Sequence, residues 1–167
     1  EAHAAARRGW DAEASTRRLW ARDAALFSNA DEARWLGWLE LPNAQPDSAI
    51  GPAALRDAVA RHPARFAVVL EMGGSSLWPD VLGRTWNGRG ARRALHVLDT
   101  TVPDAIEDFL GSVAIEDGLY FVSSKSGSTI EPNALYTLIR TRLDARVGRE
   151  AAGRHFVAIT DPGSSLE

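Results

Sequence analysis

The chain has 167 residues and no cysteine, which excludes a disulfide framework and a thiolate metal site. Its four histidines are scattered without the spacing of metal ligands, which argues against a histidine metal centre. No apolar run approaches the roughly 20 residues that cross a membrane, and the N-terminus lacks the apolar segment of a secretory signal. We therefore expect a soluble, cytoplasmic protein that needs no membrane and no metal.

Lysine is nearly absent as well, because Lys125 is the only one and all other basic side chains are arginines. The formal net charge of −3 gives the chain no global positive field, which argues against a nucleic-acid-binding protein. An anionic ligand would therefore have to be held by local geometry. The preference for arginine is explained by genomic composition, and it draws attention to the one lysine that remains.

An initiator methionine is also missing, since the chain begins at Glu1. It ends in Ser164-Ser165-Leu166-Glu167, a sequence typical of the first turn of a helix. We therefore expect an excised piece of a longer protein. At this length, one domain with an appendage is the natural organisation.

Residues 1–62 are predicted to form a helical arm and a connector. Apolar side chains recur at helical spacing, and Asn29 or Asp31 is placed to cap a second helix that stops at Pro42. A polar, proline-rich connector follows over residues 42–51, and then a short helix to about residue 61. Most of the six tryptophans lie in this arm, where they indicate packing against this domain or another part of the protein.

A different pattern begins after Pro63, where short, continuous apolar runs alternate with helical patterns. Such runs are typical of strands buried on both faces, and they lie at residues 66–70, 95–98, 119–122 and 156–159. The alternation predicts an α/β fold, in which a doubly wound parallel sheet forms a flavodoxin-like, three-layer sandwich with its helices.

The helices between these strands are predicted from capping and periodicity. The first is expected from about Leu77 to Leu82, and the second begins with Thr101 as its cap and proline in its first turn. The third begins near Pro132 and buries a row of leucines and an isoleucine. These elements would cover both faces of the sheet.

Two polar loops follow the first and third expected strands, at residues 73–76 and 124–129. If the strand order is 2-1-3-4, the two loops flank the point where the order reverses. Doubly wound sheets bind their ligands outside the carboxyl ends of the strands at that point. We therefore expect both loops to face one cleft.

The second loop collects hydroxyl groups, a glycine and Lys125 just before a helix. The first N–H groups of a helix have no intrahelical partner, and the helix dipole favours an anion there, so the loop suits a phosphate group. A capping box formed by Ser128 and Glu131 would explain the same residues without a ligand, and the two interpretations are compatible. No nucleotide P-loop and no Gly-x-Gly-x-x-Gly pattern occurs, so no nucleotide cofactor is expected.

The first loop offers a related chemistry. Its two glycines let the backbone approach a ligand and its two serines add hydroxyl groups, although a plain strand-to-helix turn uses the same residue types. Glu71, Asp99 and Asp161 lie near strand ends, within reach of the cleft, but carboxylates at such positions are more often caps or loop partners.

Three segments, in order and spacing, resemble the sugar isomerase (SIS) domain of glucose-6-phosphate isomerases. They are Met72-Gly73-Gly74-Ser75-Ser76-Leu77-Trp78-Pro79, Ser124-Lys125-Ser126-Gly127-Ser128-Thr129-Ile130-Glu131-Pro132 and Thr160-Asp161-Pro162-Gly163-Ser164. This resemblance covers residues 65–167. Residues 34–39, in the arm, further resemble the isomerase half of bifunctional transaldolase/glucose-6-phosphate isomerases.

The resemblance implies a parent enzyme of glycolysis and gluconeogenesis that is a homodimer. It interconverts glucose 6-phosphate and fructose 6-phosphate without a cofactor, by proton transfer through a cis-enediol. Carried over by position, the residues that hold the substrate phosphate are Ser124, Lys125, Ser126 and Thr129, and those that line the sugar end are Gly74 and Ser75.

The chain departs from the family's pattern at several places. Trp78 stands where many members have glycine, and Pro132 stands where some have threonine, which removes one hydroxyl contact. Nothing in residues 1–167 matches the family's catalytic glutamate, ring-opening histidine, Gly-Gly-Arg segment or C-terminal lysine. We therefore expect a substrate-binding half-site without the catalytic base, and an isolated fragment without activity.

The sequence thus predicts an SIS sugar-phosphate-binding domain over residues 63–167, truncated at its C-terminus, with the arm and connector before it. Three alternatives stay open. One is a sugar-phosphate-binding SIS module that regulates and does no chemistry, and another is the isomerase domain of an aminosugar-phosphate synthase. The third is a plain Rossmann-like domain with serine-rich turns and no ligand.

Overall fold

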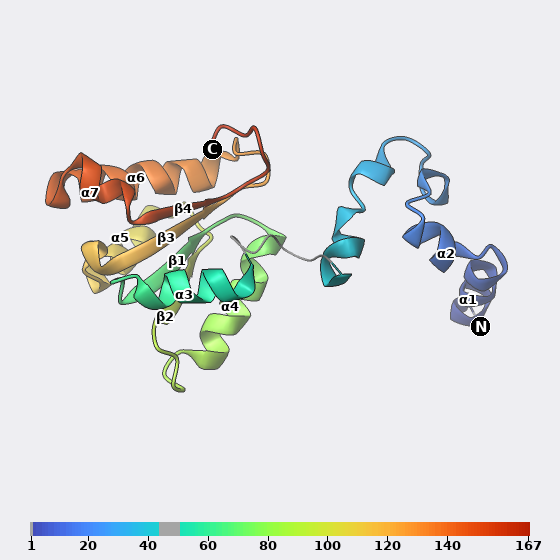
Figure 1. The fold of residues 1–167 in the computed structure, drawn as a ribbon, viewed down its shortest axis with the longest axis horizontal. Coiled ribbons are helices and arrows are strands. Elements are labelled where there is room, and N and C mark those ends of the chain that lie inside the picture. Colours follow the sequence, from blue (N-terminus) through green and yellow to red (C-terminus); the bar gives the residue numbers. More distant parts are fainter. Residues whose placement is uncertain (1, 44–50) are drawn as a thin grey trace. The chain divides into compact units, whose positions relative to one another are not determined.

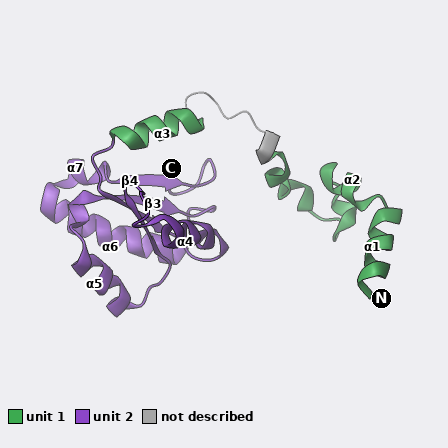
Figure 2. Cartoon of the chain, turned by 90° about the horizontal axis from the view of Figure 1, so that it is seen from below, with its two compact units in different colours: residues 1–61 green, residues 62–167 purple. Residues whose placement is uncertain are grey.

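The computed structural model describes residues 2–43 and 51–167, and it describes side chains for residues 2–40 and 51–167. Contacts divide the chain into two compact units, Glu1–Arg61 and His62–Glu167 (Figure 2). The predicted division into an arm and connector over residues 1–62 and a sugar-phosphate-binding domain over residues 63–167 stays a prediction. Most of the predicted connector lies outside the described residues.

The first unit is less regular than the predicted helical arm. It contains the helices α1 (Ala2–Ala12), α2 (Ser15–Trp20) and α3 (Pro52–Arg61), and three 3₁₀ helices at Ala24–Leu26, Glu32–Arg34 and Gly37–Asn43. The predicted second α-helix of the arm is wrong, because Asp31 precedes only a short 3₁₀ turn and its side chain makes no capping bond. The helix after Gly51 is confirmed.

Side chains that bond to the backbone explain this break in the arm. The Asp23 carboxylate accepts a hydrogen bond from the N–H of Ala25 at 2.9 Å, and the Glu32 carboxylate accepts from the N–H groups of Ser28 and Ala30 at 2.9 Å each. Such local bonds offer the backbone an alternative to a continuous helix. The helical periodicity in this segment is therefore interrupted by turns that polar side chains stabilise.

The second unit is built on four parallel strands in the order β2-β1-β3-β4, which confirms the predicted fold class. This is also the strand order on which the expectation of a shared cleft depended. The strands are β1 (Phe66–Leu70), β2 (Ala94–Leu98), β3 (Gly118–Ser123) and β4 (Phe156–Ile159). All four lie within a residue or so of the predicted apolar runs. Because the two strands in the middle are buried on both sides, their sequences are continuously apolar.

Helices cover both faces of this sheet (Figure 1). They are α4 (Gly74–Trp86), α5 (Pro103–Ser112), α6 (Ile130–Val147) and α7 (Arg149–Gly153). A guanidinium nitrogen of Arg142 donates to Glu107 at 3.1 Å and so joins α6 to α5, whereas α4 lies across the sheet from α6 (Figure 1). This arrangement follows from right-handed crossovers in a sheet whose strand order reverses between β1 and β3.

The hydrophobic core lies between the sheet and the helices α5 and α6. Val68, Leu70, Ile139 and Leu143 are fully buried in it. Alternate residues of β1 point into this layer, because successive side chains of a strand face opposite sides of the sheet. Tyr120 is also fully buried, and its hydroxyl donates to the carbonyl oxygen of Ile115 at 2.9 Å, so its polar end is satisfied.

Two details of the predicted helices are wrong. Helix α4 begins at Gly74, so the serines of the first polar loop belong to its first turn. The N-cap of α5 is Val102, and the hydroxyl of Thr100 rather than of Thr101 accepts from the Val102 N–H at 3.1 Å. The six tryptophans are all at least 42 % exposed, so none is buried in a core, and their expected packing against another part of the protein stays a prediction.

Candidate functional site

A small cavity lies at the carboxyl edge of the sheet, where β1, β3 and β4 end. Its volume is about 280 Å³, and its lining residues are Glu71, Ser75, Ser123, Lys125, Ile159, Thr160 and Asp161. These residues come from the loop after β1, the end of β3 and the end of β4. Ser75 and Lys125, predicted from separate loops, therefore lie on the same cavity.

The loop after β3, residues 124–129, is organised by hydrogen bonds between its own side chains. The hydroxyl of Ser124, which is only 4 % exposed, donates to the hydroxyl oxygen of Thr129 at 2.9 Å. The hydroxyls of Ser126 and Ser128 lie 2.9 Å apart, and the Ser128 N–H donates to the Ser126 hydroxyl at 3.2 Å. The hydroxyl groups thus fix the shape of the loop before any ligand is considered.

The predicted capping box in this loop is wrong. The N-cap of α6 is Thr129, not Ser128, and it makes no side-chain capping bond. The Ser128 N–H bonds within the loop, and the Thr129 hydroxyl is engaged with Ser124. The Thr129 side chain therefore does not cap the first N–H groups of α6. These N–H groups remain suited to an anionic ligand, as the sequence predicted.

Gly127 sits at the tip of the loop with a φ of +70°, a conformation that glycine adopts without strain. Its carbonyl oxygen accepts from the amide of Asn133 at 2.9 Å and from the hydroxyl of Ser165 at 2.8 Å. The Asn133 amide also donates to the carbonyl oxygen of Thr129 at 2.9 Å. One side chain from the first turn of α6 thus holds two carbonyl groups of the loop.

The segment after β4 supports the same loop from behind. The Asp161 N–H donates to the carbonyl oxygen of Lys125 at 3.1 Å, and the Thr160 hydroxyl donates to the hydroxyl of Ser164 at 2.6 Å. Residues 160–164, the third segment of the family resemblance, therefore hold residues 124–132, the second segment, by a hydrogen bond. This role follows from the three-dimensional arrangement, because about thirty residues of chain separate the two segments.

Replacing Asn133 with alanine removes both loop bonds at once. Since a hydrogen bond contributes on the order of 1 kcal/mol, we expect the free energy of unfolding to fall by about 1–3 kcal/mol. Urea denaturation measures this loss. Thr137→Val is the matched control, because that hydroxyl lies one turn further along α6 and donates only to the carbonyl oxygen of Asn133. Equal destabilisation by the two variants would contradict this role of Asn133.

The loop after β1 presents a second set of polar groups. Gly73 precedes α4 with a φ of +106°, and the buried hydroxyl of Ser76 lies 2.8 Å from the Gly73 carbonyl oxygen and 3.2 Å from the Asp99 carboxylate. Burial, together with the nearby Asp99 charge, raises the pKa of the Glu71 carboxyl above its usual range, and a backbone hydrogen bond from Ser76 opposes this shift. Asp99 itself does not line the cavity.

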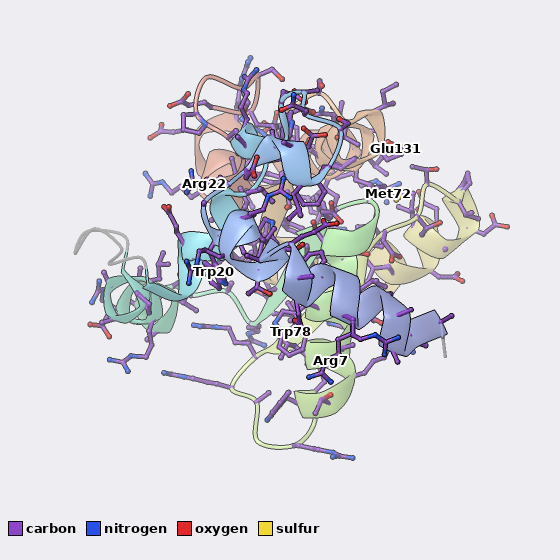
Figure 3. The ribbon with its side chains drawn as sticks, turned by 90° about the vertical axis from the view of Figure 1, so that its right-hand side faces the viewer. Arg7, Trp20, Arg22, Met72, Trp78 and Glu131 are labelled. Atoms are coloured by element: carbon purple, nitrogen blue, oxygen red, sulfur yellow. The ribbon has the colours of Figure 1, made fainter. Side chains whose placement is uncertain are left out.

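Figure 3 labels three residues of this unit, Met72, Trp78 and Glu131. Met72 belongs to the loop after β1, and Glu131 lies in the first turn of α6. The Trp78 side chain, on α4, is 67 % exposed and is not among the cavity's lining residues. The Trp78 indole therefore does not form part of the wall of this cavity.

Not every predicted site residue reaches the cavity. Among the predicted residues, Ser75 and Lys125 line it, whereas Ser124, Ser126, Thr129 and Gly74 do not. Sequence reasoning missed Asn133 and the supporting serines after β4. A signal for Asn133 existed, because an amide four residues after a loop residue at a helix start is placed to bond back to the loop.

A larger hollow of about 820 Å³ runs along α6 and is lined by residues such as Ile130, Leu138 and Thr141. It is mostly apolar, and seven of its eight lining residues belong to α6. The smaller cavity at the carboxyl edge is the better candidate site, because it joins the ends of three strands and combines a cation with hydroxyl groups.

Among the described residues, no group of three or more histidine, aspartate or glutamate side chains is arranged to hold a metal ion. No described helix is both long and apolar enough to cross a membrane.

Comparisons with known proteins give a consistent result. No protein-family profile matches the chain. The glucose-6-phosphate isomerase of Geobacter sulfurreducens is 33% identical over 172 aligned positions, which cover 87% of this chain and 31% of that protein. The chain thus spans about a third of the length of the curated relatives that it matches.

Solved structures also match most of this chain. A hypothetical protein of Thermus thermophilus matches 97% of this chain with a TM-score of 0.75 and 30% identity, over 36% of its own length. A glucose-6-phosphate isomerase of Chlamydia trachomatis matches 89% with a TM-score of 0.60 and 27% identity, over 27% of its length. The chain is therefore a homologue, in sequence and in fold, of about one third of a glucose-6-phosphate isomerase.

Proposed function

We propose that the chain binds the phosphate group of a sugar phosphate at the loop after β3. Ser124, Lys125, Ser126 and Thr129 form this phosphate site, and the sugar extends toward Gly74 and Ser75. One observation carries the proposal: Lys125 and Ser75, from loops about fifty residues apart in sequence, line one cavity at the carboxyl edge of the sheet.

The chemistry of the loop supports a phosphate ligand. Helix α6 has 18 residues, and its first N–H groups lie beside the loop, so backbone donors and the helix dipole favour an anion there. The hydroxyls of Ser126 and Ser128 bond to each other and can be redirected to phosphate oxygens, because a hydroxyl both donates and accepts. Lys125 adds the positive charge.

We further propose that the complete protein is a cytoplasmic, homodimeric glucose-6-phosphate isomerase whose SIS domain includes residues 63–167, with or without a fused transaldolase. The names of the relatives support an isomerase, and this chain matches only about a third of the length of each relative. It would supply substrate binding, and other parts of the protein would supply the base that moves the proton between C2 and C1. Binding accelerates a reaction only when such a base is positioned against the bound sugar.

Calorimetric titration tests the binding proposal directly. The chain is titrated with glucose 6-phosphate, with inorganic phosphate and with glucose. We expect saturable binding of glucose 6-phosphate, weaker binding of phosphate and none of glucose. If neither glucose 6-phosphate nor inorganic phosphate binds, the proposed phosphate site is contradicted.

A coupled assay of fructose 6-phosphate formation tests the proposal that the catalytic base lies in other parts of the complete protein. We expect no turnover by the 167-residue chain, because the resemblance implies that the proton-transferring groups lie in other parts of the complete protein. Measurable isomerisation by the purified chain would contradict the assignment of the base to another part of the protein.

A further inference from the structure

Glu71 is the most unusual polar group of the candidate site. It directly follows β1 and lines the cavity with Lys125 and Ser75. Its Oε2 atom is buried and has no hydrogen-bond partner, and it is the one buried side-chain oxygen or nitrogen so found among the described residues. Buried polar atoms almost always have a partner, so such an exception requires an explanation.

The protein groups around Glu71 do not supply that partner. The Ser76 N–H lowers the pKa of the carboxyl group but also donates to the Gly73 carbonyl oxygen at 3.2 Å, and the hydroxyl of Ser76 is engaged with the Gly73 carbonyl oxygen and Asp99. Asp99 brings another negative charge, which repels a carboxylate. Glu71 thus lines the cavity with a carboxyl group whose Oε2 atom lacks a hydrogen-bond donor.

We propose that Glu71 is a sugar-binding residue, whose carboxyl group turns toward the cavity and accepts a hydrogen bond from a hydroxyl group of the bound sugar phosphate. This inference rests on the proposed function and adds a contact that none of the predicted site residues provides. A sugar hydroxyl is the donor that fits, because a phosphate group at Glu71 would meet like charge from Glu71 and Asp99. The carboxyl group would thus help to orient the ligand, with its phosphate at Lys125 and its hydroxyls at Glu71.

Two variants of Glu71 separate this contact from a general electrostatic effect. Glu71→Ala removes both the charge and the acceptor, and Glu71→Gln removes the charge but keeps a carbonyl oxygen. Glu150→Gln is the control, because its side chain is 93% exposed on α7, which precedes β4 and so lies away from the carboxyl edge. Each variant is titrated with glucose 6-phosphate and with inorganic phosphate, and its fold is checked by circular dichroism.

The ratio of the two affinities is the informative quantity. For Glu71→Ala we expect glucose 6-phosphate to bind about tenfold more weakly, while inorganic phosphate binds as well as before or better. Glu71→Gln should lose less than the alanine variant, and Glu150→Gln should change neither affinity. A simple loss of structure cannot produce this pattern, because it weakens both ligands together.

Two other results would overturn the inference in distinguishable ways. If the original chain binds both ligands and Glu71→Ala changes both affinities by the same factor, Glu71 does not contact the sugar, and the phosphate site stands. If the original chain binds neither ligand, the proposed function fails and this inference fails with it.

Discussion

Replacing Lys125 with alanine should weaken glucose 6-phosphate binding by about 10- to 100-fold and leave the fold intact. A charge-assisted hydrogen bond to a phosphate contributes on the order of 1.5–3 kcal/mol, and each 1.4 kcal/mol is a factor of about ten in affinity. Lys125 is exposed, so its removal creates no cavity in the core. Calorimetric titration gives the loss, and thermal unfolding confirms that stability is retained.

Arg92→Ala is the matched control for this experiment. It also removes one exposed cation of the second unit, but Arg92 precedes β2 and so lies near the amino ends of the strands, opposite the cavity. We expect little change in affinity from this control, and a weaker dependence of Lys125→Ala binding on salt, because one fewer charge is screened. If the two variants bind glucose 6-phosphate equally well, the loop after β3 is not the phosphate site.

Replacing Gly127 with alanine should both destabilise the second unit and abolish phosphate binding. Its φ of +70° is unfavourable for alanine, and an added Cβ would lie 2.8 Å from the Ser164 hydroxyl and 3.0 Å from the Ser165 nitrogen. The loop and the segment after β4 would have to move apart. We expect the free energy of unfolding to fall by roughly 2 kcal/mol or more, measured in urea.

Gly88→Ala separates conformational strain from the clash. Gly88 has a similar φ of +77°, but nothing lies within 4 Å of the position of an added Cβ. The control should lose about 1 kcal/mol through strain and keep its affinity for glucose 6-phosphate. Loss of stability and binding to the same extent in both variants would show that packing against Ser164 is not what shapes the phosphate loop.

Much of the second unit was predictable from the sequence because its strands are continuous apolar runs. Phe66–Leu70 and Gly118–Ser123 are central strands, and central parallel strands are buried on both faces, which leaves a clear local signal. The first unit gave no such signal. Its helical periodicity is real, but the carboxylates of Asp23 and Glu32 bond to nearby N–H groups and replace helix with turns.

The candidate site was predictable only in part, for a similar reason. Residue types that bind phosphate could be recognised in residues 124–129, and the strand order placed them beside residues 73–76. Which hydroxyls pair with each other could not be known, because that depends on distances within the loop. Ser128 was predicted to be a helix cap and instead bonds to Ser126.

The sequence by itself determined the fold class and the two polar loops that follow strands, because apolar periodicity and loop composition are local properties of the chain. Only the tertiary structure decided the strand order, and that Asn133 and Ser165 hold the Gly127 carbonyl group. It also decided that Oε2 of Glu71 is buried without a partner, in a residue that lines the same cavity as Lys125. The physical reason is that hydrogen-bond partners and burial are set by residues far apart in sequence, which meet only when the sheet forms.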